Sequence, residues 1–562
     1  MVTTKNSASS LLELLSNSFV QTTLALGIVI LLASVLARPT SRSTNATPIP
    51  HVPETVPYVS NTIHYLLDVA AFLDRVSELL KSTQSDIVKS YLGFRPFYFV
   101  AGQRNVQKLF GSPEILDGDF LHFILMDKQW GMTKIEMAKF REDKSGRLAK
   151  PLPGSENLGP DKRYWRNHNR LYTDYLTDTR HSEALVGEFT RRFSQRLDQQ
   201  VVDVDEGWGT VSLLDTVRTH MFECAVETLF GTRVFDLNPG FTKCYWEYDE
   251  VAPKFLGGLP IVFQPRAARI KDRIHAMVRR HIDAAWDSFD WNGPDADALW
   301  EPHFGSRLSR ESARWLREQG FSDHVIAGHT LATLFGLNGN SVAITAWAVA
   351  ELLQDPPLLT AVRSEILTGA VNKETGELDA QRVVGLPLLL SVYTEIMRLH
   401  VSFSVTREVR RGPFEFSPGC WAETGAIIQT CTTDAHLDEK VWDVDGHPAS
   451  QFWAYRHVRT EEILDERTGQ KVIQTKFAMR GRPTSFFPYG GGYWLCPGRH
   501  FGKMEIMLAL ALIVAKRDLE FVGWTNLDGT KSDRPARNDL RYAGSIAMFP
   551  DRDVCLRWRK AQ

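Results

Sequence analysis

The sequence predicts a mainly α-helical protein with a small β region, built as one large domain behind an N-terminal membrane anchor. Apolar residues recur with a spacing near 3.6 at 184–197, 213–230 and 267–286, and a longer helical pattern covers 322–355. Aromatic and β-branched residues between glycine and proline at 91–102 predict a β-hairpin. A chain of 562 residues is long for one domain, but helical proteins with a buried cofactor reach this size.

Charge and cysteine usage exclude several classes of protein. The chain has 65 Lys and Arg against 67 Asp and Glu, so we expect no nucleic-acid partner. Its six cysteines are scattered with no C-x-x-C pair, which supports neither a disulfide framework nor a zinc ribbon. Cys496 and His500 have the spacing of half a zinc site, but the sequence offers no second half.

The N-terminus is predicted to attach the protein to a membrane. After a short tail at 1–14, residues 15–37 contain no charge and predict a transmembrane signal-anchor. A cleaved signal peptide is the alternative. Arg38 and Arg42 follow the span, however, and this placement keeps the C-terminal bulk in the cytosol. Closely spaced prolines make 38–57 a stiff hinge.

One glycine-rich stretch, 486–502, carries a single cysteine in front of an apolar run at 503–515. The run predicts a buried helix, so Cys496 precedes a helix N-terminus. The helix dipole and free backbone N–H groups there favour a thiolate. A thiolate among glycines and aromatic residues suits an axial ligand of haem iron. The alternative is a buried structural cysteine after a turn.

The spacing of Tyr489, Gly492, Cys496 and Gly498 resembles the haem-binding loop of the cytochrome P-450 family. The aromatic residue lies seven before the cysteine, and the two glycines lie four before and two after it. The resemblance implies a cytochrome P-450 fold, with 58–562 as the catalytic haem domain. It also implies haem (iron protoporphyrin) as the cofactor, with Cys496 as the metal ligand and the other three residues in the cofactor-binding loop.

Partners for the haem propionates depart from the family pattern. Trp494 stands where the family usually has Arg or His. Trp165 matches the third major helix of the family, but Asn169 replaces the arginine four residues later. The resemblance therefore makes Arg407 the expected charged propionate partner, with Trp165 as a hydrogen-bond donor. Two arginines could substitute if the helix register shifts, although a solvated basic face explains them equally well: Arg166 and Arg170.

The centre of the long predicted helix, 335–341, holds two glycines and two asparagines, which predicts a bulge where a ligand approaches. In the family this helix crosses the distal haem face, and the usual acid and threonine are Gly339 and Asn340 here. Asn340 and the next residue, Ser341, are the catalytic candidates. Asparagine at this place resembles the branch of the sterol 7α-hydroxylases and prostacyclin synthase. The first hydroxylate with dioxygen, and the second isomerises an endoperoxide without a reductase.

Other segments match the family in order. Glu395, Arg398 and Arg456 are expected to form a buried structural triad. Residues 240–264 fall where the family has mobile substrate-access elements. The strand at 401–407 is expected to line the substrate pocket, or to be an ordinary strand, through three small side chains: Val401, Ser404 and Val405.

The resemblance implies a monooxygenase that hydroxylates a lipophilic small molecule such as a terpenoid, steroid or polyketide. The sequence of the glycine-rich loop resembles that of filamentous-fungal members of the family and suggests secondary metabolism. Electrons would come from NADPH through a cytochrome P-450 reductase, with the protein in the endoplasmic reticulum membrane by a single span and its catalytic domain cytosolic. The alternatives are a peroxide isomerase or dehydratase needing no reductase, and a non-catalytic haem-binding protein. Four cations are candidates for the reductase surface: Arg499, Lys503, Lys516 and Arg517.

Overall fold

The computed structural model describes residues 49–200, 207–464 and 470–561. The predicted tail and signal-anchor, and the hinge up to residue 48, lie outside these ranges. Across the three described ranges, no helix combines the length and the apolar composition that a bilayer crossing requires.

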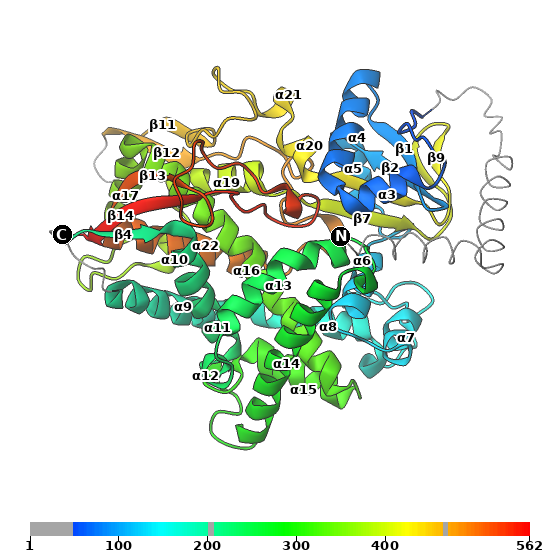
Figure 1. Ribbon diagram of the computed structural model, residues 1–562, viewed down its shortest axis with the longest axis horizontal. Helices are drawn as coiled ribbons and strands as arrows, with labels where there is room; N and C mark the ends of the chain where they lie inside the picture. The colour runs from blue at the N-terminus through cyan, green and yellow to red at the C-terminus, as the bar shows by residue number, and fades with distance from the viewer. Residues whose placement is uncertain (1–48, 201–206, 465–469, 562) are drawn as a thin grey trace, which may run out of the picture.

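The N-terminal part confirms the predicted hairpin, formed by β1 (Ile87–Leu92) and β2 (Arg95–Val100). This hairpin joins a five-stranded sheet of order β1-β2-β10-β7-β3, so strands from the last third of the chain complete it. Three helices accompany the sheet at one end of the molecule (Figure 1): α3 (Ser60–Leu67), α4 (Val69–Thr83) and α5 (Gln103–Gly111). The other three strands are β3 (Leu116–Asp117), β7 (Ser404–Val409) and β10 (Ile427–Cys431).

The middle of the chain forms the helical body. Its helices are α6 (Asp119–Lys128), α7 (Lys134–Glu142), α8 (Tyr164–Leu176), α9 (Thr179–Gln199), α10 (Leu213–Thr216), α11 (Phe222–Phe230), α12 (Arg233–Leu237), α13 (Phe241–Leu256), α14 (Pro265–Ser288) and α15 (Arg307–Glu318). The single helix predicted over 213–230 is wrong in one respect. A π-helical turn, η2 (Val217–Met221), interrupts it between α10 and α11.

The long central helix is α16 (Asp323–Gln354), and its N-cap is Ser322 as the sequence indicates. The predicted bulge at 335–341 is absent, because α16 continues through this stretch. Its polar side chains bond back instead of breaking the helix: Asn338, Asn340 and Ser341 each donate to the carbonyl four residues earlier, at 2.9–3.2 Å. Such local bonds keep the carbonyls satisfied where the helix propensity is poor.

The C-terminal part surrounds α16 with helices and small sheets. The helices are α17 (Pro356–Gly369), α18 (Ala380–Val383), α19 (Pro387–His400), α20 (Thr432–His436), α21 (Glu439–Trp442) and α22 (Arg499–Lys516). The hairpins pair β5 (Trp300–Glu301) with β6 (Gly305–Ser306), β8 (Phe414–Ser417) with β9 (Cys420–Ala422), and β11 (Val458–Leu464) with β12 (Lys471–Phe477). A sheet of β13 (Arg517–Thr525), β14 (Asp553–Lys560) and β4 (Gly209–Ser212) lies at the end opposite the N-terminal sheet (Figure 1). The main apolar core runs between the two sheets through α16, α19 and α22.

Candidate haem-thiolate site

The cysteine loop ends where α22 begins, as the sequence predicts. The Cys496 N–H donates to the carbonyl of Tyr489 at 3.1 Å, which closes the loop on itself. Burial raises the pKa of the Cys496 thiol, while the backbone N–H groups of Gly498 and Arg499 act in the opposite direction. The N-terminus of α22 therefore favours the thiolate as predicted, but burial has the larger effect on the pKa of Cys496 when no ligand is bound.

Close approach to a neighbouring helix explains one loop glycine. Gly492 has φ +65°, and a Cβ atom there would lie 2.3 Å from the carbonyl oxygen of Phe110 at the end of α5. Only glycine combines this conformation with this contact. On the other side of the loop, the hydroxyls of Tyr489 and Tyr393 are 2.6 Å apart, which ties the loop to α19.

The predicted triad is confirmed. Glu395 accepts from Arg398 at 2.7 and 2.9 Å and from Arg456 at 2.9 Å, and none of the three side chains is exposed. His457 adds a contact at 3.3 Å. Burial opposes ionisation of Glu395, but hydrogen bonds from Arg398, His457 and Arg456 lower its pKa to about 2. The remaining guanidinium hydrogens reach backbone carbonyls, including those of Ala449 and Trp442. The triad is thus a fully paired, buried structural unit.

Arg407 lies on β7, buried, with its guanidinium carbon 4.6 Å from the centroid of the Trp494 ring. It donates to the carbonyls of Thr406 and Gly491 at 2.9 and 3.1 Å. No partner for its Nε exists among the described residues, and no carboxylate pairs with it directly. Burial lowers the pKa of Arg407 to about 10. A buried guanidinium without a counter-ion fits an external anion.

A second arginine, Arg147, was not recognised from the sequence because it lies in the loop between α7 and α8. Its guanidinium donates to Asp119 at 2.6 and 3.0 Å and sits 4.5 Å from the Trp165 ring centroid. The Trp494 indole N–H donates to the same Asp119 oxygen at 2.8 Å. Burial would raise the pKa of Asp119, but Arg147 and its other partners lower it overall.

The buried charges around Trp494 and Trp165 suit the binding of an anionic group. Arg407 and Arg147 bring two buried guanidinium groups to a cluster with Asp119, while the neighbouring Asp117 is already paired with Arg410 at 2.7 Å. Nearby His122 is neutral, because burial and Arg147 lower its pKa to about 3. The cluster therefore has excess positive charge at the place where the resemblance puts the carboxylate end of a haem. The residues present fit a haem, with Cys496 toward the iron and the arginine pair toward the propionates.

Comparisons with known proteins decide the family. A profile described as Cytochrome P450 matches residues 138–523. The chain is 41% identical to the cytochrome P450 monooxygenase calL of Penicillium decumbens over 505 residues, which are 89% of this chain and 91% of the relative. The chain belongs to the cytochrome P450 family. This P450 is also 26% identical to the cytochrome P450 monooxygenase efuG of Hormonema carpetanum, over 84% of each chain. It is 24% identical to the cholesterol 7-alpha-monooxygenase of Cricetulus griseus, over 76% of this chain and 84% of the relative.

The family assignment confirms the resemblance, including its distant link to the sterol 7α-hydroxylases. Members of the family use haem with a cysteine thiolate ligand, and the relatives named above are monooxygenases. The protein is therefore a haem-thiolate monooxygenase with a mainly helical P450 fold.

In the third major helix of this P450, α8, the predicted propionate donor is already in use. The Trp165 indole N–H donates to the carbonyl of Phe140 at 2.9 Å. Of the two alternative arginines, Arg170 is exposed and pairs with Asp174 at 3.1 Å, so it lies on the solvated face. Asn169 and Arg166 are half-buried and make no side-chain hydrogen bond to Arg407 or Arg147.

The two catalytic candidates on α16 of this P450 face different ways. No atom lies within 4 Å of a Cβ built on Gly336, and Asn340 follows one turn later. The Asn340 amide oxygen accepts from the Ala547 N–H at 2.9 Å, and its nitrogen donates to the Gly336 carbonyl at 3.2 Å. Ser341 is buried and close enough to Glu505 of α22 to lower the pKa of that carboxyl. The structure does not bring Ser341 to the face that carries Gly336 and Asn340.

The predicted pocket strand behaves as an ordinary strand. Val405 is 1% exposed within a separate apolar cluster, and the Ser404 hydroxyl accepts from the Gln429 amide at 2.9 Å. Val401 is buried and forms a bridge with Ala547. All three side chains are therefore buried against neighbouring residues. The predicted access region at 240–264 contains α13, half of whose residues are buried, and the short turn η3 (Ile261–Phe263).

Proposed function

We propose that this P450 inserts one oxygen atom from dioxygen into a lipophilic small molecule, such as a terpenoid, steroid or polyketide, in secondary metabolism. The observation that carries the proposal is the cysteine loop, which presents Cys496 at the N-terminus of α22 and contacts Arg407, a buried arginine that no carboxylate pairs with directly. The similarity to fungal proteins named monooxygenases supports it. When bound, a haem with a thiolate ligand supplies the oxygen activation.

The chain's own residues have separable roles in this proposal. Cys496 is the metal ligand, and Tyr489, Gly492 and Gly498 shape the loop that holds it. Arg407 and Arg147 hold the propionates, while Trp165 packs beneath Arg147. Asn340 has one amide hydrogen left for a ligand in the open space beside Gly336, since its oxygen and its other hydrogen are engaged. Residues 58–562 are the catalytic haem domain.

The proposal includes a membrane location, with 15–37 as a single span in the endoplasmic reticulum and 38–57 as the hinge. Support comes from apolar side chains that the described part leaves exposed near the N-terminus and after α13. Leu67 of α3 is 67% exposed, and Val262 and Phe263 are 76% and 75% exposed. The two places are adjacent, because Leu66 lies 3.2 Å from a Cβ built on Gly258. A shared apolar surface of this kind fits contact with a bilayer.

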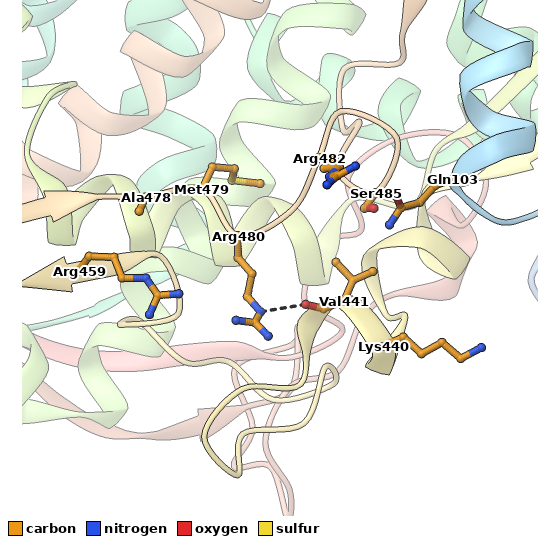
Figure 2. A pocket seen from close by; sticks show the side chains of 9 residues that line it. All are labelled: Gln103, Lys440, Val441, Arg459, Ala478, Met479, Arg480, Arg482 and Ser485. Carbon is orange, nitrogen blue, oxygen red and sulfur yellow. Dashed lines mark hydrogen bonds between the residues drawn. The ribbon is translucent and has the colours of Figure 1, made fainter.

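We also propose that an NADPH–cytochrome P450 reductase docks beside the cysteine loop. Of the four predicted cations, Lys516 pairs with Asp198 at 2.6 Å and Arg517 is buried, which leaves Arg499 and Lys503. A hollow of about 490 Å³ adds four cations, of which two lie on the segment that leads into the loop and the others on α21 and β11 (Figure 2). None of the four forms an ion pair within the part of the chain that the structure describes: Lys440, Arg459, Arg480 and Arg482.

The experiment that tests the function is a reconstitution with haem, reductase, NADPH and dioxygen. The carbon-monoxide difference spectrum of the wild type should show the thiolate band, and Cys496→Ala should lose it while the control Cys555→Ala keeps it. NADPH consumption should require both reductase and dioxygen. Turnover of a peroxide substrate without them would instead support the isomerase alternative, since Gly339 and Asn340 in place of the usual acid and threonine are compatible with both reactions.

A further inference from the structure

A carboxylate from α13 occupies the space beside the centre of α16. Asp249 is fully buried, and its Oδ1 lies 2.9 Å from the position that a Cβ on Gly339 would take. The neighbouring Tyr245 donates its hydroxyl to the Leu334 carbonyl at 3.3 Å, which holds α13 against the same stretch of α16. Any side chain at position 339 would therefore collide with the Asp249 carboxylate. Glycine at this position makes room for an acid that belongs to another helix.

The two oxygens of Asp249 are in different situations. Its Oδ2 accepts from the Tyr542 hydroxyl at 3.1 Å. Its Oδ1 is buried and has no hydrogen-bond partner among the described residues. An unpaired buried oxygen is costly, because it has lost its hydration without replacement. In this protein the unpaired oxygen points to Gly339, one helical turn from Gly336, whose surroundings are open.

The surroundings of Asp249 bring the pKa of its carboxyl close to neutral pH. Burial raises the pKa of Asp249 to about 7, although Arg218, the Tyr542 hydroxyl and Arg541 lower it and Glu250 raises it. Arg218 belongs to the π-helical turn η2 and makes no ion pair with Asp249; its guanidinium carbon lies 4.7 Å from the Phe549 ring centroid. The other titratable groups facing the carboxyl are the buried hydroxyls of Tyr245 and Tyr248. Such a carboxyl can hold a proton and release it near neutral pH.

We propose that Asp249 is the proton donor to a ligand bound in the open space beside Gly336, acting from α13 through the gap that Gly339 leaves in α16. This assignment rests on the proposed monooxygenase function. The carboxyl gives its proton from Oδ1 to a ligand in the open space beside Gly336, and a water molecule returns a proton to Oδ1. The Tyr542 hydroxyl donates to Oδ2 in both states.

The first experiment compares Asp249→Asn with Glu351→Gln in the reconstituted, substrate-free protein. Glu351 lies on α16, and burial raises its pKa to about 7 as well, so this variant removes a similar carboxyl elsewhere. Reductase-supported NADPH oxidation should fall about 100-fold in Asp249→Asn, the effect of losing a general acid. It should stay at the wild-type rate in Glu351→Gln. A wild-type rate in Asp249→Asn overturns the proposal, provided that its carbon-monoxide spectrum and melting temperature are unchanged.

A second readout does not depend on turnover. In the wild type, the infrared band of a protonated carboxylic acid should shift when carbon monoxide binds the haem. Asp249→Asn should lack the shifting band, and Glu351→Gln should retain it. If the wild type consumes no NADPH but the band shifts, the proposed function fails while the placement of Asp249 stands. A band that does not respond to carbon monoxide overturns that placement.

A swap of positions separates the chemistry from a structural role. Asp249→Ala should be slow in NADPH oxidation, and Gly339→Asp alone should be unstable because its side chain meets Asp249. The double variant Asp249→Ala with Gly339→Asp moves the carboxylate onto α16 into the vacated space. Its rate of NADPH oxidation should be at least about tenfold higher than that of Asp249→Ala. A double-mutant cycle measures this coupling. If the double variant is folded but as slow as Asp249→Ala, a carboxyl at this place is not the proton donor.

Discussion

Two buried glutamates lie on helices that flank the cysteine loop, and they differ in their partners and in the direction in which their pKa is shifted. Glu395 of α19 is surrounded by Arg398, Arg456 and His457, and these partners lower its pKa to about 2. Glu505 of α22 has no hydrogen-bond partner for either oxygen among the described residues, and burial raises its pKa to about 8. Burial alone therefore does not decide the charge of a carboxyl; its partners do.

The contrast separates a finished region, in which every buried charge has a partner, from an unfinished region, in which some buried polar groups have none among the described residues. Around Glu395 the chain supplies every counter-ion, so this region needs nothing from outside to be stable. Between α13, α16 and α22, the carboxyls of Asp249 and Glu505 keep unpaired oxygens, and Arg407 keeps an unpaired nitrogen on the haem side. Unpaired buried groups are costly to stability, and they are common where a ligand or a reaction uses them.

The largest expected effect comes from breaking the finished region. Glu395→Ala would leave two guanidinium groups buried without a carboxylate, and it should lower the free energy of unfolding by about 3–5 kcal/mol. Urea unfolding of the haem-loaded protein measures this loss. The control is Glu188→Ala, whose surface pairs with Arg191 and Arg192 should contribute about 0–1 kcal/mol. A similar loss in both variants would contradict the distinction.

A pH effect should appear next, in the unfinished region. Because the pKa of Glu505 is raised in the folded state, its stabilising contribution is complete below the unfolded pKa near 4.5 and is lost as pH rises through about 8. Glu505→Gln should abolish this dependence and gain on the order of 2–4 kcal/mol relative to the wild type above pH 8. Unfolding curves on both sides of that pH measure it. Parallel pH profiles of the two proteins would show that Glu505 is not buried in its acid form.

A smaller effect is expected at the arginine cluster. Arg407→Leu should weaken haem binding about tenfold to 100-fold, since a hydrogen bond to a charged group contributes about 1.5–3 kcal/mol. Transfer of haem to an apoprotein scavenger measures the change. Arg410→Leu, just after the end of β7, is the control, because Arg410 is exposed and pairs with Asp117 and Glu408. Faster haem loss from Arg410→Leu than from Arg407→Leu would remove Arg407 from the site.

How far the sequence reaches follows from which contacts are local. The hairpin and the ends of α16 are predictable, because alternation and capping residues specify them, whereas the Glu395 triad is predictable only through the family resemblance that adds Arg456 to the Glu395–Arg398 pair. The role of Arg147 is not, because its loop has no periodicity and its partner Asp119 lies 28 residues earlier. Asp249 is also hidden. Only the fold brings it to Gly339, although an acid on an apolar helix face indicates a residue with a role of its own.

The smallest expected effect distinguishes two glycines within helices. Gly187 of α9 is exposed with nothing within 4 Å of a built Cβ, so Gly187→Ala should stabilise the protein by about 1 kcal/mol through helix propensity. Gly339→Ala should give no such gain, because its methyl group meets Asp249 and Ile546. Melting temperatures of both variants measure the difference. An equal gain in both would show that the space beside Gly339 is not filled.

The origin of Asp249 on α13 has a consequence for timing. An acid carried by α16 would keep its place whatever its neighbours do. Asp249 stays next to Gly339 only while α13 rests against α16, and α13 leads directly into the exposed apolar turn at Ile261–Phe263. A movement of α13 away from α16 would therefore also carry Asp249 away from Gly339. In the proposed role of Asp249, the supply of protons would then depend on the contact between these two helices.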